Sequence, residues 1–98
     1  MKIAIACDHA GFDGRKAATQ TIEALGHEVQ DLGPQEGESV DYPDFAHKVA
    51  TAVESGSADF GVLICGTGQG MAMSANRHSG VRAAVLTDEM TTSMSREH

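Results

Sequence analysis

The chain has 98 residues, of which 41% are hydrophobic and 4% aromatic, and its formal net charge at pH 7 is −7. This length suits a single domain. The acidic balance and the lack of tryptophan argue against broad binding to nucleic acid or to an anionic membrane surface.

No apolar run approaches the roughly 20 residues that span a membrane. Two cysteines do not make a secreted disulfide framework, and the opening MKIAIACDHA becomes polar too soon for a signal peptide. We therefore expect a cytoplasmic protein.

The first half of the sequence predicts two strand–helix units. The apolar, isoleucine-rich run Lys2–Cys7 is typical of a buried strand. Residues 12–25 then carry apolar side chains at helical spacing and are followed by Gly26, a residue that favours a helix C-terminus. Residues 27–32 alternate apolar and polar side chains, which indicates a second strand. After a polar loop, Pro43 suits the first turn of a second helix that continues to about residue 55.

The second half repeats the alternation. Residues 59–65 form an apolar run that predicts a third strand, and residues 68–76 predict a helix that begins inside a glycine-rich loop. Residues 81–86, VRAAVL, predict a fourth strand. Asp88 is a suitable N-cap for a last helix that includes Met90 and Met94.

This order of elements predicts the fold. Short apolar strands joined by helices favour a parallel sheet covered on both faces. We expect one domain over residues 1–98, a three-layer αβα, Rossmann-like fold with strand order 2-1-3-4. The last residues fall within a helical stretch with no closing strand after it. The sequence is therefore expected to be truncated at its C-terminus.

The ends of two predicted strands carry the residues of greatest chemical interest. The first strand runs into Asp8 and His9, and the third ends at Cys65, followed by GTGQG. Ligands of open parallel sheets bind beyond the carboxyl ends of the strands, near the point where the strand order reverses. In the order 2-1-3-4 these two ends are neighbours. We therefore expect Asp8, His9 and Cys65 around one pocket.

The glycine loop after Cys65 favours binding of an anion. Glycines lack a Cβ, so the backbone can turn its amides towards a ligand and approach it closely. A helix that begins near Gly68 adds unpaired N–H groups and the positive end of a dipole. Together these groups suit a phosphate or an enolate oxygen. They also favour the thiolate of Cys65, which could remove a proton from a carbon next to a carbonyl.

A purely structural interpretation of the same residues stays open. The loop could be a tight turn, since it matches neither a Walker A loop nor the dinucleotide-binding motif. Cys65 could be a small buried hydrophobic residue, and Cys7 is expected to be structural. A metal site made of Cys7, His9 and Cys65 would lack a fourth ligand, so we expect no metal. Other histidines are expected at the surface or in a turn: His27, His47 and His78.

Four segments in this order resemble a known family: KIAIACDHAGF, DYPDFA, GVLICGTGQGMAMSANR and VRAAVL. They are similar to ribose-5-phosphate isomerase B, whose family also contains the galactose-6-phosphate isomerase subunits. The resemblance covers essentially the whole chain. It implies an aldose–ketose isomerase that interconverts ribose 5-phosphate and ribulose 5-phosphate through a cis-enediolate without a cofactor. It also implies a homodimer or tetramer with sites at the subunit interface.

The resemblance also implies roles for individual residues. Cys65 matches the catalytic base, and Thr67 and His98 match residues that help to open the sugar ring. The resemblance implies that Asp8 binds a sugar hydroxyl, that His9 lies near the phosphate end and that Tyr42 lines the pocket wall. The loop glycines Gly66, Gly68 and Gly70 match the segment whose amides hold the enediolate oxygens.

Family members continue beyond the residue that matches His98. The additional part carries a fifth strand and the arginines that hold the phosphate, which again implies a truncated chain. Two alternatives to the ribose enzyme stay open. One is an isomerase of a 6-phosphate sugar, allose or galactose. The other is a non-catalytic remnant that binds sugar phosphates.

Overall fold

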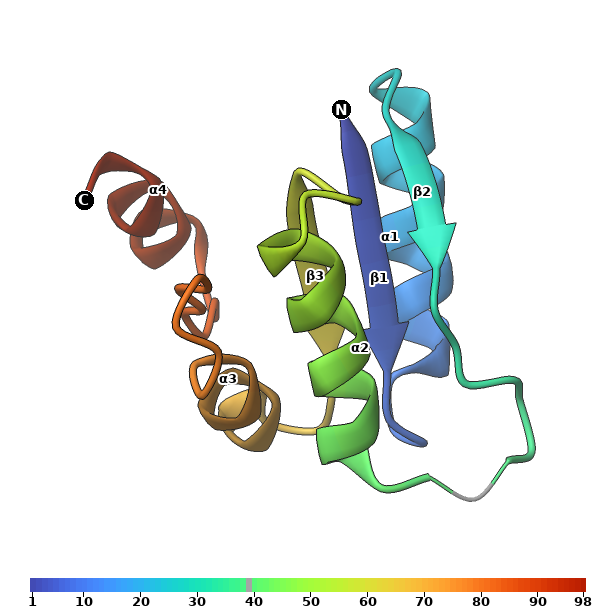
Figure 1. Cartoon of the computed structure of the whole chain (residues 1–98). Coiled ribbons are helices and arrows are strands. Elements are labelled where there is room, and N and C mark those ends of the chain that lie inside the picture. The colour runs from blue at the N-terminus through green and yellow to red at the C-terminus, as the bar shows by residue number, and fades with distance from the viewer. Residues whose placement is uncertain (39) are drawn as a thin grey trace.

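Strands and helices alternate in the computed structural model, which describes residues 1–38 and 40–98. In chain order the elements are β1 (Lys2–Cys7), α1 (Phe12–Ala24), β2 (Glu28–Asp31), α2 (Tyr42–Glu54), β3 (Phe60–Ile64), α3 (Gln69–Ala75) and α4 (Glu89–Glu97). The helices lie on both faces of a single sheet, with α1 behind it and α2 in front (Figure 1). The predicted α/β class is therefore confirmed.

The sheet is parallel and has the order β2-β1-β3. Lys2 pairs with Glu28 on one side of β1, and Ile3 pairs with Phe60 on the other. The order 2-1-3 agrees with the prediction. It places the carboxyl ends of β1 and β3 side by side.

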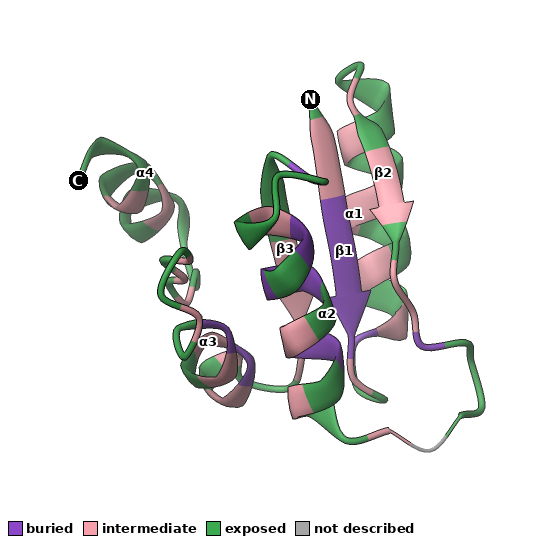
Figure 2. Cartoon of the chain, in the orientation of Figure 1, coloured by how far each residue is buried: buried purple, intermediate pink, exposed green. Residues whose placement is uncertain are grey.

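The core lies between β1 and α2. From Ala4 to Cys7 the residues of β1 are fully buried, as the purple segment of the central strand shows (Figure 2). The helix α2 turns one face towards them, with these buried residues: Phe45, Ala46, Val49, Ala50 and Ala52. Contact between α2 and β3 is close at Gly61, where a Cβ would lie 2.5 Å from Cγ1 of Val49. Helix α2 thus covers one face of the sheet at β1 and β3.

The prediction of a fourth strand at residues 81–86 is wrong for the described chain, because no such strand joins the sheet. Both main-chain polar groups of Ala83 bond instead with the side chain of Asn76, at 2.8 Å and 2.7 Å. Further along, the side chain of Val85 lies against Gly68. The segment is therefore held by α3 and its loop and does not pair with the edge of β3.

The last helix, α4, begins where the sequence predicts. Asp88 is its N-cap and accepts a hydrogen bond from the Thr91 amide at 2.7 Å. The guanidinium of Arg96 stacks 4.5 Å from the centre of the Phe60 ring, which connects α4 to the sheet side. Its methionines are largely exposed, Met90 by 71% and Met94 by 45%. Among the described residues, no helix combines the length and apolar character that crossing a membrane needs.

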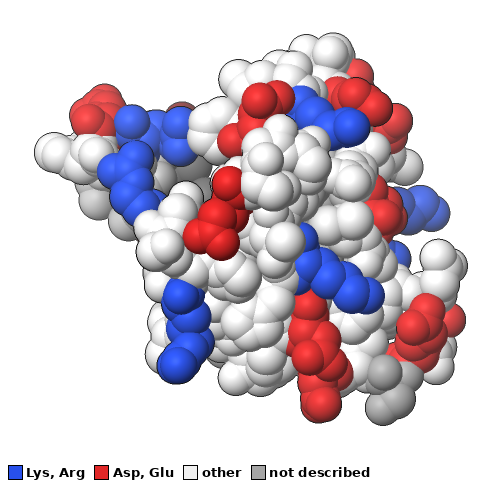
Figure 3. Space-filling view, in the orientation of Figure 1, with Lys and Arg blue, Asp and Glu red and all other residues white. Residues whose placement is uncertain are grey.

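Charged side chains are mixed on the face that Figure 3 shows, where Lys and Arg alternate with Asp and Glu. The positive charge of this face is dispersed and not gathered into one area.

Candidate active site

The short loop between β1 and α1, residues 8–11, packs directly on the carboxyl end of β3. The Asp8 amide donates a hydrogen bond to the carbonyl oxygen of Ile64 at 3.0 Å. At Gly11, a Cβ would lie 2.7 Å from the same oxygen and 2.8 Å from Cβ of Cys7. Only a residue without a side chain fits there, so the glycine of the DHAG turn lets the loop lie on the end of β3.

Asp8 shapes this loop with its own carboxylate. Its Oδ1 accepts a hydrogen bond from the Ala10 amide at 2.8 Å, and its carbonyl accepts one from Gly11 at 3.0 Å. Asp8 is half-buried and His9 is exposed. The turn therefore presents the His9 side chain to solvent at the same sheet edge.

Cys65 follows β3 and faces the start of α3. Its Sγ accepts a hydrogen bond from the Gly68 amide at 3.0 Å. Gly68 has a φ of +81°, a left-handed conformation that glycine adopts without strain. This turn directs the Gly68 N–H back to the sulfur. The thiol is half-buried, so it is within reach of a ligand at the edge.

Thr67 helps to form the same turn. Its Oγ1 accepts a hydrogen bond from the Gln69 amide at 3.2 Å, at the first residue of α3. The Ala72 amide donates to the carbonyl of Gly68 at 3.0 Å, which starts the helix. Gly66 and Thr67 are exposed. Residues 66–68 therefore form an open loop between Cys65 and α3.

Tyr42, the first residue of α2, lies against the glycine loop. A Cβ on Gly70 would lie 2.5 Å from Cε1 of its ring and 2.8 Å from Cζ. The ring is 42% exposed, so it covers Gly70 on one side and meets solvent on the other. The structure thus brings Tyr42, Cys65 and the loop glycines to one sheet edge beside Asp8 and His9.

The second cysteine, Cys7, has a different environment. It is fully buried at the end of β1. Burial raises the pKa of the Cys7 thiol, and the nearby Arg15 opposes this effect only in part. A thiol kept neutral in the interior is a poor nucleophile and base. This environment agrees with the structural role predicted for Cys7.

His98 is not brought to Cys65 of the same chain. It ends α4, is exposed, and donates its amide to the Met94 carbonyl at 3.2 Å. Figure 1 shows the C-terminus far from the carboxyl ends of the strands. Among the described residues, no group of three or more His, Cys, Asp or Glu side chains is arranged to hold a metal ion.

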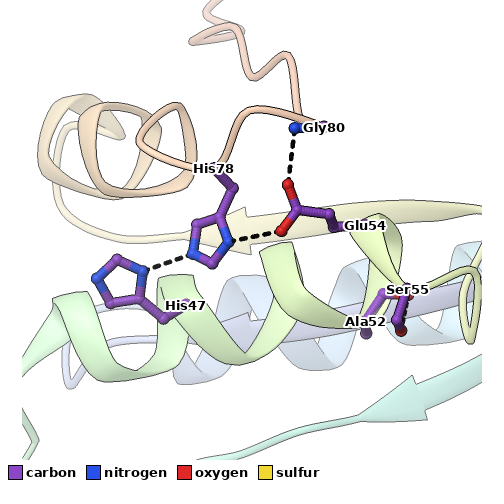
Figure 4. A network of polar contacts seen from close by, with 6 residues as sticks. All are labelled: His47, Ala52, Glu54, Ser55, His78 and Gly80. Carbon is purple, nitrogen blue, oxygen red and sulfur yellow. Dashed lines mark hydrogen bonds and ion pairs between the residues drawn. The ribbon is translucent and has the colours of Figure 1, made fainter.

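A set of polar contacts outside this site was not predicted. Nδ1 of His47 and Nε2 of His78 are 2.8 Å apart, and Nδ1 of His78 lies 3.3 Å from Oε1 of Glu54 (Figure 4). The other oxygen of Glu54 accepts the Gly80 amide at 2.7 Å. His47 and His78 are half-buried and in contact, so expecting them only at the surface and in a turn was incomplete. The one sequence signal is that His47 and Glu54 lie seven residues apart, on one face of a helix.

Comparisons with known proteins agree on one family. A family model described as Ribose/Galactose Isomerase matches residues 3–98. The ribose-5-phosphate isomerase B of Clostridium thermocellum superposes with a TM-score of 0.96 at 49% identity, covering 100% of this chain and 66% of that chain. The enzyme of the same name from Escherichia coli is 42% identical over 97 residues, 99% of this chain and 65% of its own length.

One similar structure holds a ligand. The ribose-5-phosphate isomerase B of Mycoplasma genitalium, with bound ribulose-5-phosphate, superposes with a TM-score of 0.91 at 41% identity. That match covers 99% of this chain and 65% of the other. The chain thus spans about two thirds of the length of the relatives it matches.

Proposed function

The chain belongs to the ribose/galactose isomerase family, and from this premise we propose that it carries the catalytic residues of an aldose–ketose isomerase acting on ribose 5-phosphate. The observation that carries the proposal is the environment of Cys65. Its sulfur accepts the Gly68 amide at the start of α3, at the sheet edge that also holds Asp8, His9 and Tyr42. A base beside several backbone amides suits a reaction that forms an enediolate.

The reaction moves one proton between neighbouring carbons. The thiolate of Cys65 removes the proton from C2 of the open-chain aldose, and the C–H electrons form a C1–C2 double bond. Negative charge then develops on the substrate oxygens, which accept hydrogen bonds from backbone amides of residues 66–70. A proton passes between the two oxygens, and Cys65 returns its proton to C1. The product is the ketose, and no oxidant or reductant is used.

The remaining residues bind the sugar and open its ring. Asp8 binds a sugar hydroxyl, His9 lies near the phosphate end and Tyr42 forms the pocket wall over Gly70. Thr67 and His98 assist ring opening. Since His98 lies far from Cys65 of its own chain, we propose that it serves the site of a second copy in a homodimer or tetramer. The support for this is the position of the C-terminus in Figure 1.

The test of the proposed function is a substrate panel. The complete gene product is incubated separately with ribose 5-phosphate, allose 6-phosphate and galactose 6-phosphate, and the ketose is followed by ¹³C NMR. We expect conversion of ribose 5-phosphate at the highest kcat/KM. Faster conversion of either 6-phosphate would reassign the substrate. Binding without conversion of any of them would favour a sugar-phosphate-binding remnant.

A further inference from the structure

The contacts among His47, Glu54 and His78 join two parts of the fold. His47 and Glu54 lie on α2, whereas His78 lies in the turn that follows α3. The Gly80 amide donates to Glu54, and the Val81 amide donates to the carbonyl of His78 at 3.1 Å. Figure 4 shows the two rings and the carboxylate in one row between the helix and the turn. We call this row, His47, His78 and Glu54, the histidine clasp.

The number of protons that the clasp can hold follows from its donors and acceptors. His78 donates its Nδ1–H to Glu54. With both rings neutral, Nε2 of His78 accepts a hydrogen bond from the Nδ1–H of His47. With one added proton, His78 is a cation that donates from both nitrogens, and Nδ1 of His47 becomes the acceptor. With a second added proton, both facing nitrogens carry hydrogen at 2.8 Å, and the bond between the rings is lost.

The carboxylate of Glu54 lies at one end of the clasp. The hydrogen bond from the Gly80 amide, followed by that from His78, holds the pKa of Glu54 below its usual value. The carboxylate is therefore charged wherever histidine titrates, and its Oε1 accepts the hydrogen bond from His78. Two further charged groups of α2, Asp44 and Lys48, line a hollow with His47.

The elements packed on α2 add few other charges. They are β1, β3 and α3. β3 and α3 carry no titratable side chain, and β1 carries only Lys2 at its start and the buried Cys7 at its end. The second proton is thus opposed mainly by the first cation.

We propose that the histidine clasp responds to pH. Its contacts persist with one bound proton or none, and the hydrogen bond between the rings is lost when a second proton binds. The chain that follows the clasp, from Gly80 onwards, contacts the glycine loop. The segment after Gly80 is held next at Ala83 by Asn76, and then its Val85 packs on Gly68. The clasp is the first of three attachments of this segment, before those at Ala83 and Val85. Loss of the clasp contacts releases this first attachment. The proposal stands apart from the proposed isomerase activity, since it concerns the fold around α3.

The sign of the pH effect follows from proton counts. In the unfolded chain the two histidines are free, and each binds a proton as the pH falls below about 6.5. The folded chain with a closed clasp binds at most one proton there. The unfolded state then holds more protons, so acidification favours unfolding.

The experiment is urea unfolding of the chain from about pH 7.5 to about pH 5, compared for the wild type, His47→Gln and His27→Gln. Glutamine can present either an oxygen or an N–H to Nε2 of His78, so His47→Gln keeps a contact without the second titrating ring. His27→Gln is the matched control, because His27 contacts the amino terminus and not the clasp. Below about pH 6.5, the unfolding equilibrium constant of the wild type should rise up to about tenfold per pH unit faster than that of His47→Gln.

The control variant, His27→Gln, should show the same pH dependence of unfolding as the wild type. Equal pH dependence in the wild type and His47→Gln would overturn the proposal. NMR of the wild type gives a second test that needs no variant. The rings of His47 and His78 should take up protons in two separate steps, and the Gly80 amide signal should move with the second. Independent uptake by the two rings, with a constant Gly80 signal, would also overturn it.

Discussion

At the scale of single residues, the three glycines of the loop meet different constraints. Gly66 has open space around the position of a Cβ, and Gly68 needs its positive φ to turn its amide towards Cys65. Gly70 is limited by Tyr42, whose ring occupies the place of a side chain. The motif therefore contains one glycine with free space around it, one that needs a positive φ and one whose Cβ position is occupied by the Tyr42 ring.

The first prediction concerns Gly70→Val. A branched side chain there would displace Tyr42 or push the start of α3 away from Cys65. Because loss of one oxyanion donor costs roughly 10²–10³ in rate, we expect kcat to fall by about that factor. Thr67→Ser keeps the hydroxyl that caps Gln69 and is the matched control, with a much smaller loss. Steady-state kinetics give the comparison, and a Gly70→Val enzyme as active as Thr67→Ser would mean that the loop is only a turn.

At the scale of elements, the contact between α2 and β3 depends on Gly61. A Cβ there would meet Cγ1 of Val49 at 2.5 Å and Cγ2 of Val53 at 3.3 Å. Val49 is 3% exposed, so it has little room to move. This fit determines how closely the helix lies on the strand that ends at Cys65.

We predict that Gly61→Ala destabilises the fold by about 1–3 kcal/mol, the usual cost of overpacking a well-packed contact. Val49→Ala alone also destabilises, because it leaves a cavity. In the double variant the new methyl fills part of that space, so the combined loss should be smaller than the sum of the single losses. Urea unfolding measures all three variants. Strict additivity would show that the two side chains do not compete for the same space.

The N-cap of α4 gives a pH prediction. The hydrogen bond from the Thr91 amide, and then that from its hydroxyl, lowers the pKa of Asp88 in the folded chain. A lowered pKa means that the cap stabilises the helix above the unfolded value of about 3.9. This stabilisation is lost as the pH falls through the folded value.

The Thr91 amide signal in NMR should therefore report the loss of the cap in acid. Asp88→Asn keeps a capping oxygen that does not titrate, so its signal should stay nearly constant over the same range. Asp88→Ala should lack the capped signal at every pH. Parallel changes in the wild type and Asp88→Asn would assign the acid effect to other carboxylates.

The sequence predicted most elements because their signals are local. Hydrophobic spacing located the three strands of the sheet, and Asp88 marked the start of α4. Residues 81–86 show the limit of this approach. Their exposure alternates as in a strand, with Val81, Ala83 and Val85 half-buried. Pairing also requires free main-chain groups, and at Ala83 the side chain of Asn76 takes both.

At the scale of the whole molecule, the topology explains why the candidate site was predictable. Parallel order 2-1-3 brings the ends of β1 and β3 together, so Asp8 and Cys65 lie at the same sheet edge although they are 57 residues apart in the sequence. No comparable topological rule predicts the histidine clasp from the sequence. His47 and His78 are 31 residues apart, and no strand order relates a helix face to a turn. Such contacts depend on how α2 and α3 pack, which local spacing does not determine.

The most direct test of the central claim, that Cys65 is the base of a sugar-phosphate isomerase, is solvent-deuterium exchange at C2 of ribose 5-phosphate. The complete gene product and its Cys65→Ser variant are compared in D₂O. A hydroxyl is a far weaker base than a thiol at neutral pH, and general-base catalysis typically contributes about 10²–10⁴-fold. We predict that the wild type exchanges the C2 hydrogen and that Cys65→Ser loses exchange by about this factor while still binding the sugar phosphate. Exchange at a near wild-type rate in Cys65→Ser would contradict the claim.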